Sequence, residues 1–557
     1  MHQSSYKLHL IRAGLFLLIL FPTLLGTFMA VDLTSWSMRL VYLLSGLGFY
    51  AFFYVLLKQR AFFYVAALFL LQGTFEVAHL LINHATMSLL FFWTIITSER
   101  SEFWELFTMY WFVLLLLIAL WIVYLILVKR YVPNEYRIAS PRHRALAATG
   151  IAALFALAIV LSACHYAPKT QLGKRFARTE CVEGVKKFTP INNYLIIHRL
   201  YSVIDEINSQ RDAQERFTFG IPSTPEGDDI VVLVIGETSR YDHWQINGYE
   251  RQTSPRLCAR EQQIVSFDSC YTIANLTTIC VPFILTPATP EQPNRFASEK
   301  SIVEAFQEAG YHTSWIADQS FDNGFLLRIS NQCDYRFYTP NLPRLKDSLL
   351  IEPFQAKLQQ PGKQLIVLHT LGCHFKYSVR YPKEFRIFSP DLTEIEKPNI
   401  FSPRSALEQI KQQLVNSYDN AIAYTDYILD TIIRSVERLD RSAVVLYVGD
   451  HGENLLDDQR NMILHGTYQA SEYETHVPLF MWMSDEYQER YPNVKPALQA
   501  NRNKAFTTMT IFHSLLDLGH IPYQGLDTTE SLVRPTLISH PIIYGLDANL
   551  NLTEMPK

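Results

Sequence analysis

Two apolar runs in the sequence each end in side chains that bind metal ions. Val231–Gly236 is followed by Glu237, and Val444–Gly449 is followed by Asp450 and His451. Unbroken aliphatic and β-branched runs are typical of buried strands in parallel sheets, and open α/β sheets bind ligands beyond the carboxyl ends of their strands. Either carboxylate alone would also suit a helix or turn cap. Their pairing predicts one metal site, and oxygen and imidazole ligands without thiolate favour Zn²⁺ over Mn²⁺.

A hydrolytic or transfer enzyme built on this metal would also need a nucleophile. A divalent cation makes a bound hydroxyl or thiol easier to deprotonate at neutral pH, so such side chains near a helix start are candidate nucleophiles. The segment from Cys270 to Pro282 offers four candidates, Thr272, Thr277, Thr278 and Cys280. Residue type does not choose among them, and a capping role would account for any single threonine.

The first 165 residues predict a membrane domain. Five apolar stretches are each long enough to cross a bilayer core of about 30 Å as a helix. They are residues 13–31, 40–57, 61–81, 107–128 and 145–164. Buried core helices would not leave five successive stretches without a polar face, and a signal peptide would not explain the four that follow the first.

Basic residues orient these spans, because Lys and Arg stay on the cytoplasmic side. Nine basic residues lie in three segments: the one before span one, the loop between spans two and three, and the loop between spans four and five. The loops on the opposite side carry two, Arg39 and Arg100. The N-terminus is therefore expected in the cytoplasm, and an odd number of spans places everything after about residue 165 on the other side of the membrane. In a bacterium that side is the periplasm. We expect a multi-pass inner-membrane protein with a periplasmic catalytic domain.

The exported part is expected to form one α/β domain. We predict a transmembrane domain at 1–165, a bridging segment at 166–228 and a catalytic domain at 229–557, in which strand-like runs alternate with helical patterns. Such alternation indicates a mostly parallel central sheet sandwiched by helices. A net charge of −4 gives no signal for nucleic acid. Six of the seven cysteines follow residue 165, which suggests up to three disulfides in an oxidising compartment.

The order of short motifs resembles the lipopolysaccharide (lipid A and core) phosphoethanolamine transferases, of the alkaline phosphatase/sulfatase superfamily. The resemblance covers nearly the whole chain and is closest to the core-modifying branch. It rests on Gly236-Glu-Thr-Ser-Arg240, Asn247-Gly-Tyr-Glu-Arg-Gln-Thr-Ser-Pro255, Thr277-x4-Pro282, His369-x2-Gly-x-His374, Tyr381-Pro382, Asp450-His-Gly-Glu453 and His465-Gly466.

The resemblance implies roles for individual residues. Glu237, Thr277, Asp450 and His451 match the family's zinc ligands, with Thr277 as the nucleophile. His374 and His465 match histidines that contact the transferred group or a second metal. Around Thr277 the chain lacks the small residues common in the family, which leaves Thr278 open as the nucleophile.

The loop between the third and fourth predicted spans suits a lipid substrate. Glu102 and Glu105 match two carboxylates of the family's pattern there, beside aromatic residues that can lie at a bilayer interface. Ser98 and Glu99 depart from the start of that pattern, and a simple solvated acidic face explains the two carboxylates as well.

The resemblance also implies an activity. A Zn²⁺-dependent transferase would move phosphoethanolamine from phosphatidylethanolamine to lipopolysaccharide, at a lipid A phosphate or a core sugar, through a phosphoethanolamine-threonine intermediate. One tightly bound Zn²⁺ is implied and a second is left open. We expect a monomer, and capping of anionic phosphates would favour polymyxin resistance.

Three alternatives stand beside this function. A phosphoglycerol transferase acting on a periplasmic glycan would share five spans and a threonine nucleophile. A sulfatase would share the fold, but Cys280-Val-Pro282-Phe-Ile284 has Ile284 where the formylglycine motif requires arginine. An inactive membrane scaffold would not need Glu237, Thr277, Asp450 and His451 together.

Overall fold

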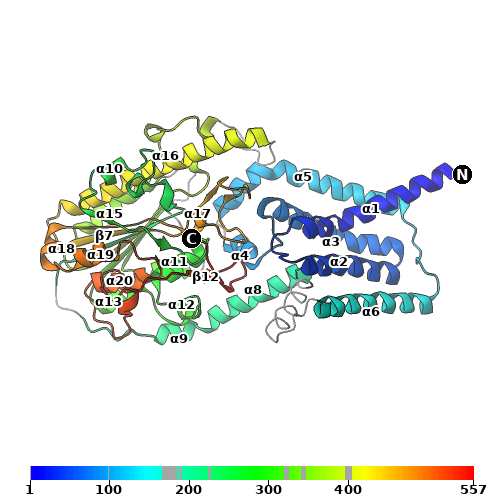
Figure 1. The fold of residues 1–557 in the computed structure, drawn as a ribbon, viewed down its shortest axis with the longest axis horizontal. Helices are drawn as coiled ribbons and strands as arrows, with labels where there is room; N and C mark the ends of the chain where they lie inside the picture. Colours follow the sequence, from blue (N-terminus) through cyan, green and yellow to red (C-terminus); the bar gives the residue numbers. More distant parts are fainter. Residues whose placement is uncertain are drawn as a thin grey trace. The chain divides into compact units, whose positions relative to one another are not determined.

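The chain divides into two compact units. The computed structural model describes residues 2–97, 100–165, 185, 187–188, 191–223, 227–318, 325–339, 346–394 and 404–557. One unit comprises Met1–Trp93 and Trp104–Ser202, and the other comprises Thr94–Phe103 and Val203–Lys557. Figure 1 shows the ribbon of both.

The described part of the first 209 residues is largely helical. Its helices are α1 (His2–Met29), α2 (Trp36–Leu56), α3 (Gln59–Asn83), α4 (Leu89–Thr97), α5 (Arg100–Tyr131), α6 (Pro141–His165) and α8 (Ile191–Ser209). Among the described residues, three helical stretches are long and apolar enough to span a membrane, Leu8–Met29, Trp36–Leu56 and Gln59–Leu81.

Three of the five predicted spans are therefore confirmed, and the count of five is not. The other two, at 107–128 and 145–164, fall within α5 and α6. These two stretches are helical, but many of their side chains lie outside the described residues. Exposed apolar side chains among the described residues of these two helices include Leu115, Leu116 and Leu120 of α5 and Leu154 of α6.

The second unit contains a seven-stranded sheet. Its order is β2-β10-β7-β1-β6-β4-β5 among the described residues. The strands are β1 (Ile230–Gly236), β2 (Ile264–Ser266), β4 (His312–Ala317), β5 (Tyr335–Tyr338), β6 (Gln364–His369), β7 (Ala443–Gly449) and β10 (Leu479–Met483). All run in one direction except β10, which is antiparallel to β7 and β2. The predicted parallel character is confirmed, and β10 makes the sheet mixed.

The register of the two central strands places the site. In the parallel pair β1–β7, Ile230 lies opposite Ala443 and Gly236 lies opposite Gly449. The chains therefore leave the sheet side by side, with Glu237 and Asp450 as the next residues.

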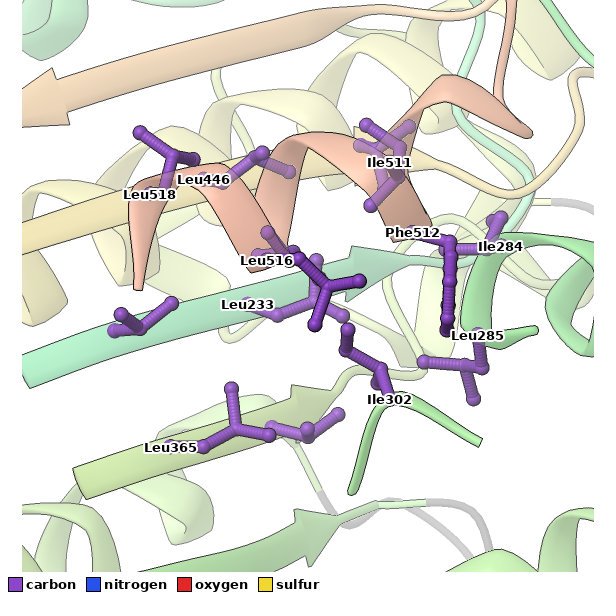
Figure 2. Packing of buried hydrophobic residues seen from close by; sticks show 14 of the residues in the cluster. Leu233, Ile284, Leu285, Ile302, Leu365, Leu446, Ile511, Phe512, Leu516 and Leu518 are labelled. Carbon is purple, nitrogen blue, oxygen red and sulfur yellow. The ribbon is translucent and has the colours of Figure 1, made fainter. Parts of the chain in front are cut away.

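Alternating side chains of β1 pack into two hydrophobic cores, one on each face of the sheet. Val231, Leu233 and Ile235 belong to one, whereas Ile230, Val232 and Val234 belong to the other. The first core includes helices α11 (Thr277–Leu285), α13 (Ile302–Glu308), α14 (Phe325–Gln332), α19 (Val494–Asn501) and α20 (Thr510–Leu518). The second includes α10 (Pro255–Cys258), α15 (Ile351–Leu358) and α16 (Arg404–Glu437). Figure 2 shows Leu516 of α20 over Leu233 of β1.

Shorter elements complete this unit. The strands are β3 (Cys270–Tyr271), β8 (Asn454–Leu455), β9 (Ile463–Leu464), β11 (Phe506–Thr507), β12 (Tyr544–Leu546) and β13 (Leu552–Glu554). The α-helices are α9 (Arg211–Arg216), α12 (Arg295–Ser298), α17 (Glu472–Thr475) and α18 (Asp485–Arg490). The 3₁₀ helices are η1 (Tyr241–His243), η2 (Gln245–Asn247), η3 (Asp347–Leu350), η4 (Tyr377–Val379), η5 (Lys383–Phe385), η6 (Leu392–Glu394) and η7 (Thr528–Glu530).

The prediction of up to three disulfides is wrong. Five cysteines of the second unit are free thiols, Cys258, Cys270, Cys280, Cys333 and Cys373. Cys270 and Cys373 are buried in the cores on opposite faces of the sheet, where a thiol packs as a small apolar group. Cys181 and the side chain of Cys164 lie outside the described residues.

Truncation of Leu233 tests the first core. Leu233 is fully buried, so Leu233→Ala is expected to lower the free energy of unfolding by about 2–5 kcal/mol, because it loses apolar burial and leaves a cavity. Leu349→Ala is the matched control, since Leu349 is 41% exposed. Thermal melting followed by tryptophan fluorescence compares the two. Equal melting temperatures would contradict the assignment of Leu233 to the core.

Candidate metal centre

The carboxylates and the imidazole of the predicted metal site lie together at the carboxyl ends of β1 and β7. Glu237 is 1% exposed, and Asp450 and His451 are 0% exposed. The backbone N–H groups of Thr238 and His451 donate to Asp450 Oδ1 at 2.9 and 2.7 Å. The turns that follow both strands thus fix the carboxylate of Asp450.

Thr277 brings a hydroxyl to the same place. It is the first residue of α11, and its Oγ1 lies 3.0 Å from Glu237 Oε2 and 3.1 Å from His451 Nε2. Thr272 instead donates to Cys280 Sγ at 3.1 Å. Thr278 follows Thr277 in the first turn of α11 and is half-buried. Of the four candidate nucleophiles, Thr277 therefore contacts both a carboxylate and the imidazole of the site.

The imidazole of His451 is oriented as metal-binding imidazoles usually are. Its Nδ1 lies 2.9 Å from the carbonyl oxygen of Gly452, and a carbonyl can only accept, so Nδ1 carries the proton. The lone pair of Nε2 then faces the other site groups, with Glu237 Oε1 at 3.6 Å and Asp450 Oδ2 at 3.5 Å. A backbone carbonyl on the far nitrogen fixes the tautomer of metal-ligating histidines in this way.

The electrostatics of the site fit a divalent cation. Burial raises the pKa of Asp450, and the neighbouring charge of Glu237 raises it further. Burial lowers the pKa of His451, but the carboxylates of Asp450 and Glu237 outweigh this and raise it. Asp450 Oδ2 is buried without a hydrogen-bond partner in the described part of the chain. A cation would balance these charges and satisfy this oxygen, so Glu237, Thr277, Asp450 and His451 fit Zn²⁺.

The structure brings His465 to this centre as well. Potential ligand atoms of Glu237, His451 and His465 all lie within 4.8 Å of one another. The rings of His451 and His465 are 4.2 Å apart between centroids, and those of His374 and His465 are 6.1 Å apart. His374 directs Nδ1 to the carbonyl of Phe375 at 2.7 Å. Both predicted histidines thus lie beside the centre, His465 nearer to His451.

Two residues of the site were given no role by sequence reasoning. Glu453 is fully buried, its Oε1 lies 3.2 Å from His465 Nδ1, and burial raises the pKa of Glu453 to about 8. Arg240 is also buried and joins the segments that follow β1 and β7. It donates to the carboxylate of Asp457 at 2.9 Å and to the carbonyl of Glu453 at 3.2 Å. Position within the two strand-end motifs was the available signal for both.

The predicted lipid contacts Glu102 and Glu105 are not tested. Both belong to α5, but their side chains lie outside the described residues. Their role stays a prediction.

A mixed sheet with carboxylate, imidazole and hydroxyl groups gathered at its carboxyl edge defines an α/β protein with a candidate metal centre. Residues 229–521, more than half of the chain, match the family model described as Sulfatase. The chain belongs to the Sulfatase family, as the predicted superfamily required.

Curated relatives are named as phosphoethanolamine transferases. The chain is 32% identical over 306 residues to the Kdo(2)-lipid A phosphoethanolamine 7''-transferase of Escherichia coli (strain K12), covering 53% of this chain and 51% of the relative. It is 28% identical over 369 residues to the phosphoethanolamine transferase EptA of Escherichia coli O157:H7, covering 62% and 64%. The chain spans about half the length of the first of these relatives.

Solved structures show the same fold. The C-terminal periplasmic domain of EcEptC from Escherichia coli, in complex with Zn, matches with a TM-score of 0.53 and 26% identity over 60% of this chain and 94% of that one. The integral membrane protein lipooligosaccharide phosphoethanolamine transferase A from Neisseria meningitidis matches with a TM-score of 0.71 and 21% identity over 94% and 99%. The second comparison shows that the fold extends to the helical N-terminal part.

Zinc content tests the centre directly. Asp450→Asn removes the charge of a buried carboxylate at nearly unchanged size, so zinc affinity should fall by at least the roughly 10–100-fold that loss of an outer-shell partner costs. Elemental analysis after dialysis against a zinc buffer measures it. Asp485→Asn is the control, on an exposed side chain at the start of α18. Unchanged zinc content in Asp450→Asn would contradict the centre.

Arg240 supplies a test of how the site is held. Arg240→Met leaves Asp457 and the carbonyl of Glu453 without their buried donor, so we expect a loss of about 3 kcal/mol or more in the free energy of unfolding. Arg502→Met should cost less than about 1 kcal/mol, because Arg502 pairs with Asp268 at the surface. Chemical denaturation compares the two variants. Equal stabilities would show that Arg240 does not support the site.

Proposed function

We propose that the chain transfers phosphoethanolamine from phosphatidylethanolamine to lipopolysaccharide, at a lipid A phosphate or a core sugar. The observation that carries the proposal is the hydroxyl of Thr277, within 3.1 Å of both Glu237 and His451 at the first residue of α11. The names of the curated relatives supply the transferred group and the class of acceptor.

Thr277 acts as the nucleophile. Its Oγ1 forms a bond to the phosphorus of the donor lipid, and the bond from phosphorus to the glycerol oxygen breaks. Glu237 Oε2, to which the hydroxyl of Thr277 donates at 3.0 Å, is the neighbour that accepts the hydroxyl proton. The departing oxygen takes up a proton and leaves as diacylglycerol, and phosphoethanolamine remains esterified to Thr277.

The acceptor then reverses these steps. A hydroxyl or phosphate oxygen of lipopolysaccharide attacks the phosphorus, the bond to Thr277 Oγ1 breaks, and the threonine recovers its proton. His374 and His465 lie at the edge of the centre, where they can hold the transferred group or move a proton at the leaving oxygen. The first turn of α11 presents backbone N–H groups beside Thr277, and helix N-termini favour phosphoryl groups.

A Zn²⁺ bound by Glu237, Thr277, Asp450 and His451 would make the threonine hydroxyl more acidic and balance negative charge on the phosphoryl oxygens. The Zn-complexed EcEptC domain among the structural relatives supports this choice of metal. The burial of Asp450 and Glu237 supports it independently, because buried carboxylates are stabilised by a cation. A second ion near His465 is not required.

The membrane-domain helices support an inner-membrane location with the catalytic domain in the periplasm. Leu8–Met29, Trp36–Leu56 and Gln59–Leu81 have the length and apolarity of spans. A monomer anchored in this way would meet a donor lipid and an acceptor lipid in one leaflet, with Glu102 and Glu105 as contacts for a headgroup. Added ammonium groups on lipid A would lower the attraction of cationic peptides such as polymyxin.

A formylglycine sulfatase would need Cys280 in the site. Cys280 is fully buried, and burial raises the pKa of its thiol to about 12. Its Sγ accepts a hydrogen bond from Thr272. These contacts favour a packing role for Cys280 and leave Thr277 as the nucleophile of the proposal.

A covalent adduct tests the nucleophile. After incubation with phosphatidylethanolamine, peptide mass spectrometry should find phosphoethanolamine on Thr277. Thr277→Ala should lose the adduct and lower transfer by about 10³-fold or more, because the group that forms the intermediate is gone. Thr278→Ala is the matched control and should keep both.

Two outcomes would contradict the proposal. An adduct that persists in Thr277→Ala and vanishes in Thr278→Ala would move the nucleophile to Thr278. A phosphoglycerol adduct formed from phosphatidylglycerol, with none from phosphatidylethanolamine, would establish a phosphoglycerol transferase instead.

A further inference from the structure

A buried glutamate outside the metal centre contacts the segments that carry residues of that centre. Glu474 lies in α17 (Glu472–Thr475) and is 0% exposed. Its carboxylate accepts hydrogen bonds from Asn275 and Thr467. Asn275 lies two residues before Thr277, and Thr467 lies two residues after His465. One carboxylate thus contacts both the segment that leads to the candidate nucleophile and the segment that follows a histidine of the site.

The contact with Asn275 acts on the segment that leads into α11. Asn275 Nδ2 donates to Glu474 Oε1 at 2.8 Å and to the carbonyl oxygen of Thr467 at 3.1 Å. The backbone carbonyl of Asn275 accepts the N–H of Gly466 at 3.1 Å. Asn275 is only 3% exposed, so water has little access to these bonds. Side-chain and main-chain contacts therefore fix the backbone two residues before Thr277.

The contact with Thr467 acts on the segment that follows His465. Thr467 Oγ1 donates to Glu474 Oε2 at 2.7 Å, and the backbone N–H of Thr467 donates to Glu474 Oε1 at 3.3 Å. Thr467 is 3% exposed. The backbone just after His465 is thus bound to the same carboxylate as Asn275.

The main chain of Glu474 holds a third segment. Its carbonyl oxygen accepts the N–H of Gly452 at 2.7 Å. Gly452 directly follows His451, whose Nε2 lies 3.1 Å from Thr277 Oγ1. Glu474 therefore connects to both members of this close pair. Its main chain reaches the segment of His451, and its side chain reaches the segment of Thr277.

Helix capping explains only part of these contacts. Glu474 is the third residue of α17 and forms a capping box with Ser471, whose backbone N–H donates to Glu474 Oε2 at 2.8 Å. A capping box satisfies N–H groups at the start of its own helix and needs no partner elsewhere. The bonds to Asn275 and Thr467 therefore go beyond what this short helix requires.

The charge of Glu474 suits this connecting role. A buried carboxylate is stable only when hydrogen-bond donors satisfy its oxygens. Here Oε1 accepts from Asn275 and from the N–H of Thr467, and Oε2 accepts from the hydroxyl of Thr467 and the N–H of Ser471. Hydrogen bonds to an ionised acceptor are about twice as strong as neutral ones. The carboxylate thus holds its partners more firmly than an amide of the same shape would.

We propose that Glu474 is a positioning residue, which sets the place of the Thr277 hydroxyl relative to His451. It acts through the side chain of Asn275 and through its own backbone carbonyl. The inference rests on the proposed function, because it takes Thr277 as the group that attacks the donor lipid. A misplacement of about 1 Å can lower a reaction rate about 10²-fold, so this alignment has a measurable effect.

Loss of the Asn275 amide tests the connection. Asn275→Ala removes the donor to Glu474 Oε1 and leaves the capping box of α17 intact. We expect the phosphoethanolamine adduct on Thr277 to form about 10- to 100-fold more slowly, because the hydroxyl is misaligned. KM for phosphatidylethanolamine should stay unchanged, since lipid binding is not altered. Quenched-flow mass spectrometry of the full chain in micelles measures both quantities.

Two capping-box variants separate positioning from stability. Glu474→Gln and Glu304→Gln exchange the acidic residue of equivalent capping boxes, in α17 and in α13, for its amide. Both variants should lower the melting temperature, and only Glu474→Gln should also slow adduct formation. In the Glu474→Gln background, Asn275→Ala should slow the reaction less than it does in the parent, because residues of one hydrogen-bond network do not act additively.

Crystal structures provide a readout that does not depend on turnover. In Asn275→Ala, Thr277 Oγ1 should lie beyond hydrogen-bonding distance of His451 Nε2, against 3.1 Å in the parent. An unmoved hydroxyl, or equal slowing in Glu474→Gln and Glu304→Gln, would overturn the proposal. If the parent forms no adduct, the proposed function fails, and the position of the hydroxyl still decides whether Glu474 positions it.

Discussion

Two carboxylates buried side by side are the constraint on which the site depends. Because β1 and β7 are parallel and in register, Glu237 and Asp450 follow paired residues and leave the sheet together. Like charges repel strongly away from water, so the arrangement needs compensation. The protein supplies part of it through the N–H groups on Asp450 Oδ1 and through His451. Asp450 Oδ2 has no hydrogen-bond partner among the described residues, and a cation there would supply the rest.

The fold meets this constraint by close packing around the strand ends. A Cβ at Gly236 would lie 2.2 Å from the hydroxyl oxygen of Tyr447, and one at Gly452 would lie 2.0 Å from the carbonyl oxygen of Tyr473. Side chains at these positions would push apart the two turns that carry Glu237, Asp450 and His451. Arg240 connects the two turns, because it follows β1 and donates to Glu453 and Asp457, which follow β7. The first residue of α11, Thr277, lies beside these turns.

The sequence predicted the elements that carry strong local patterns. The apolar runs of β1 and β7 are found close to their expected positions, because burial on both faces of a sheet leaves an unbroken apolar run in the sequence. The reversed direction of β10 was beyond prediction, since a buried strand reads the same in either direction. The disulfide expectation failed because cysteine also packs as an apolar residue. The contacts of Glu453 with His465 and of Arg240 with Asp457 join residues whose side-chain positions the sequence does not give, so these two roles could be assigned only from the structure.

The central claim is that Glu237, Thr277, Asp450 and His451 bind one zinc ion at the nucleophile. An anomalous difference map, recorded at the zinc absorption edge from crystals of the full chain, tests it most directly. The account predicts a peak about 2.0–2.2 Å from the ligand atoms of these four residues. A strongest peak on other residues, or none in crystals that elemental analysis shows to contain zinc, would contradict it.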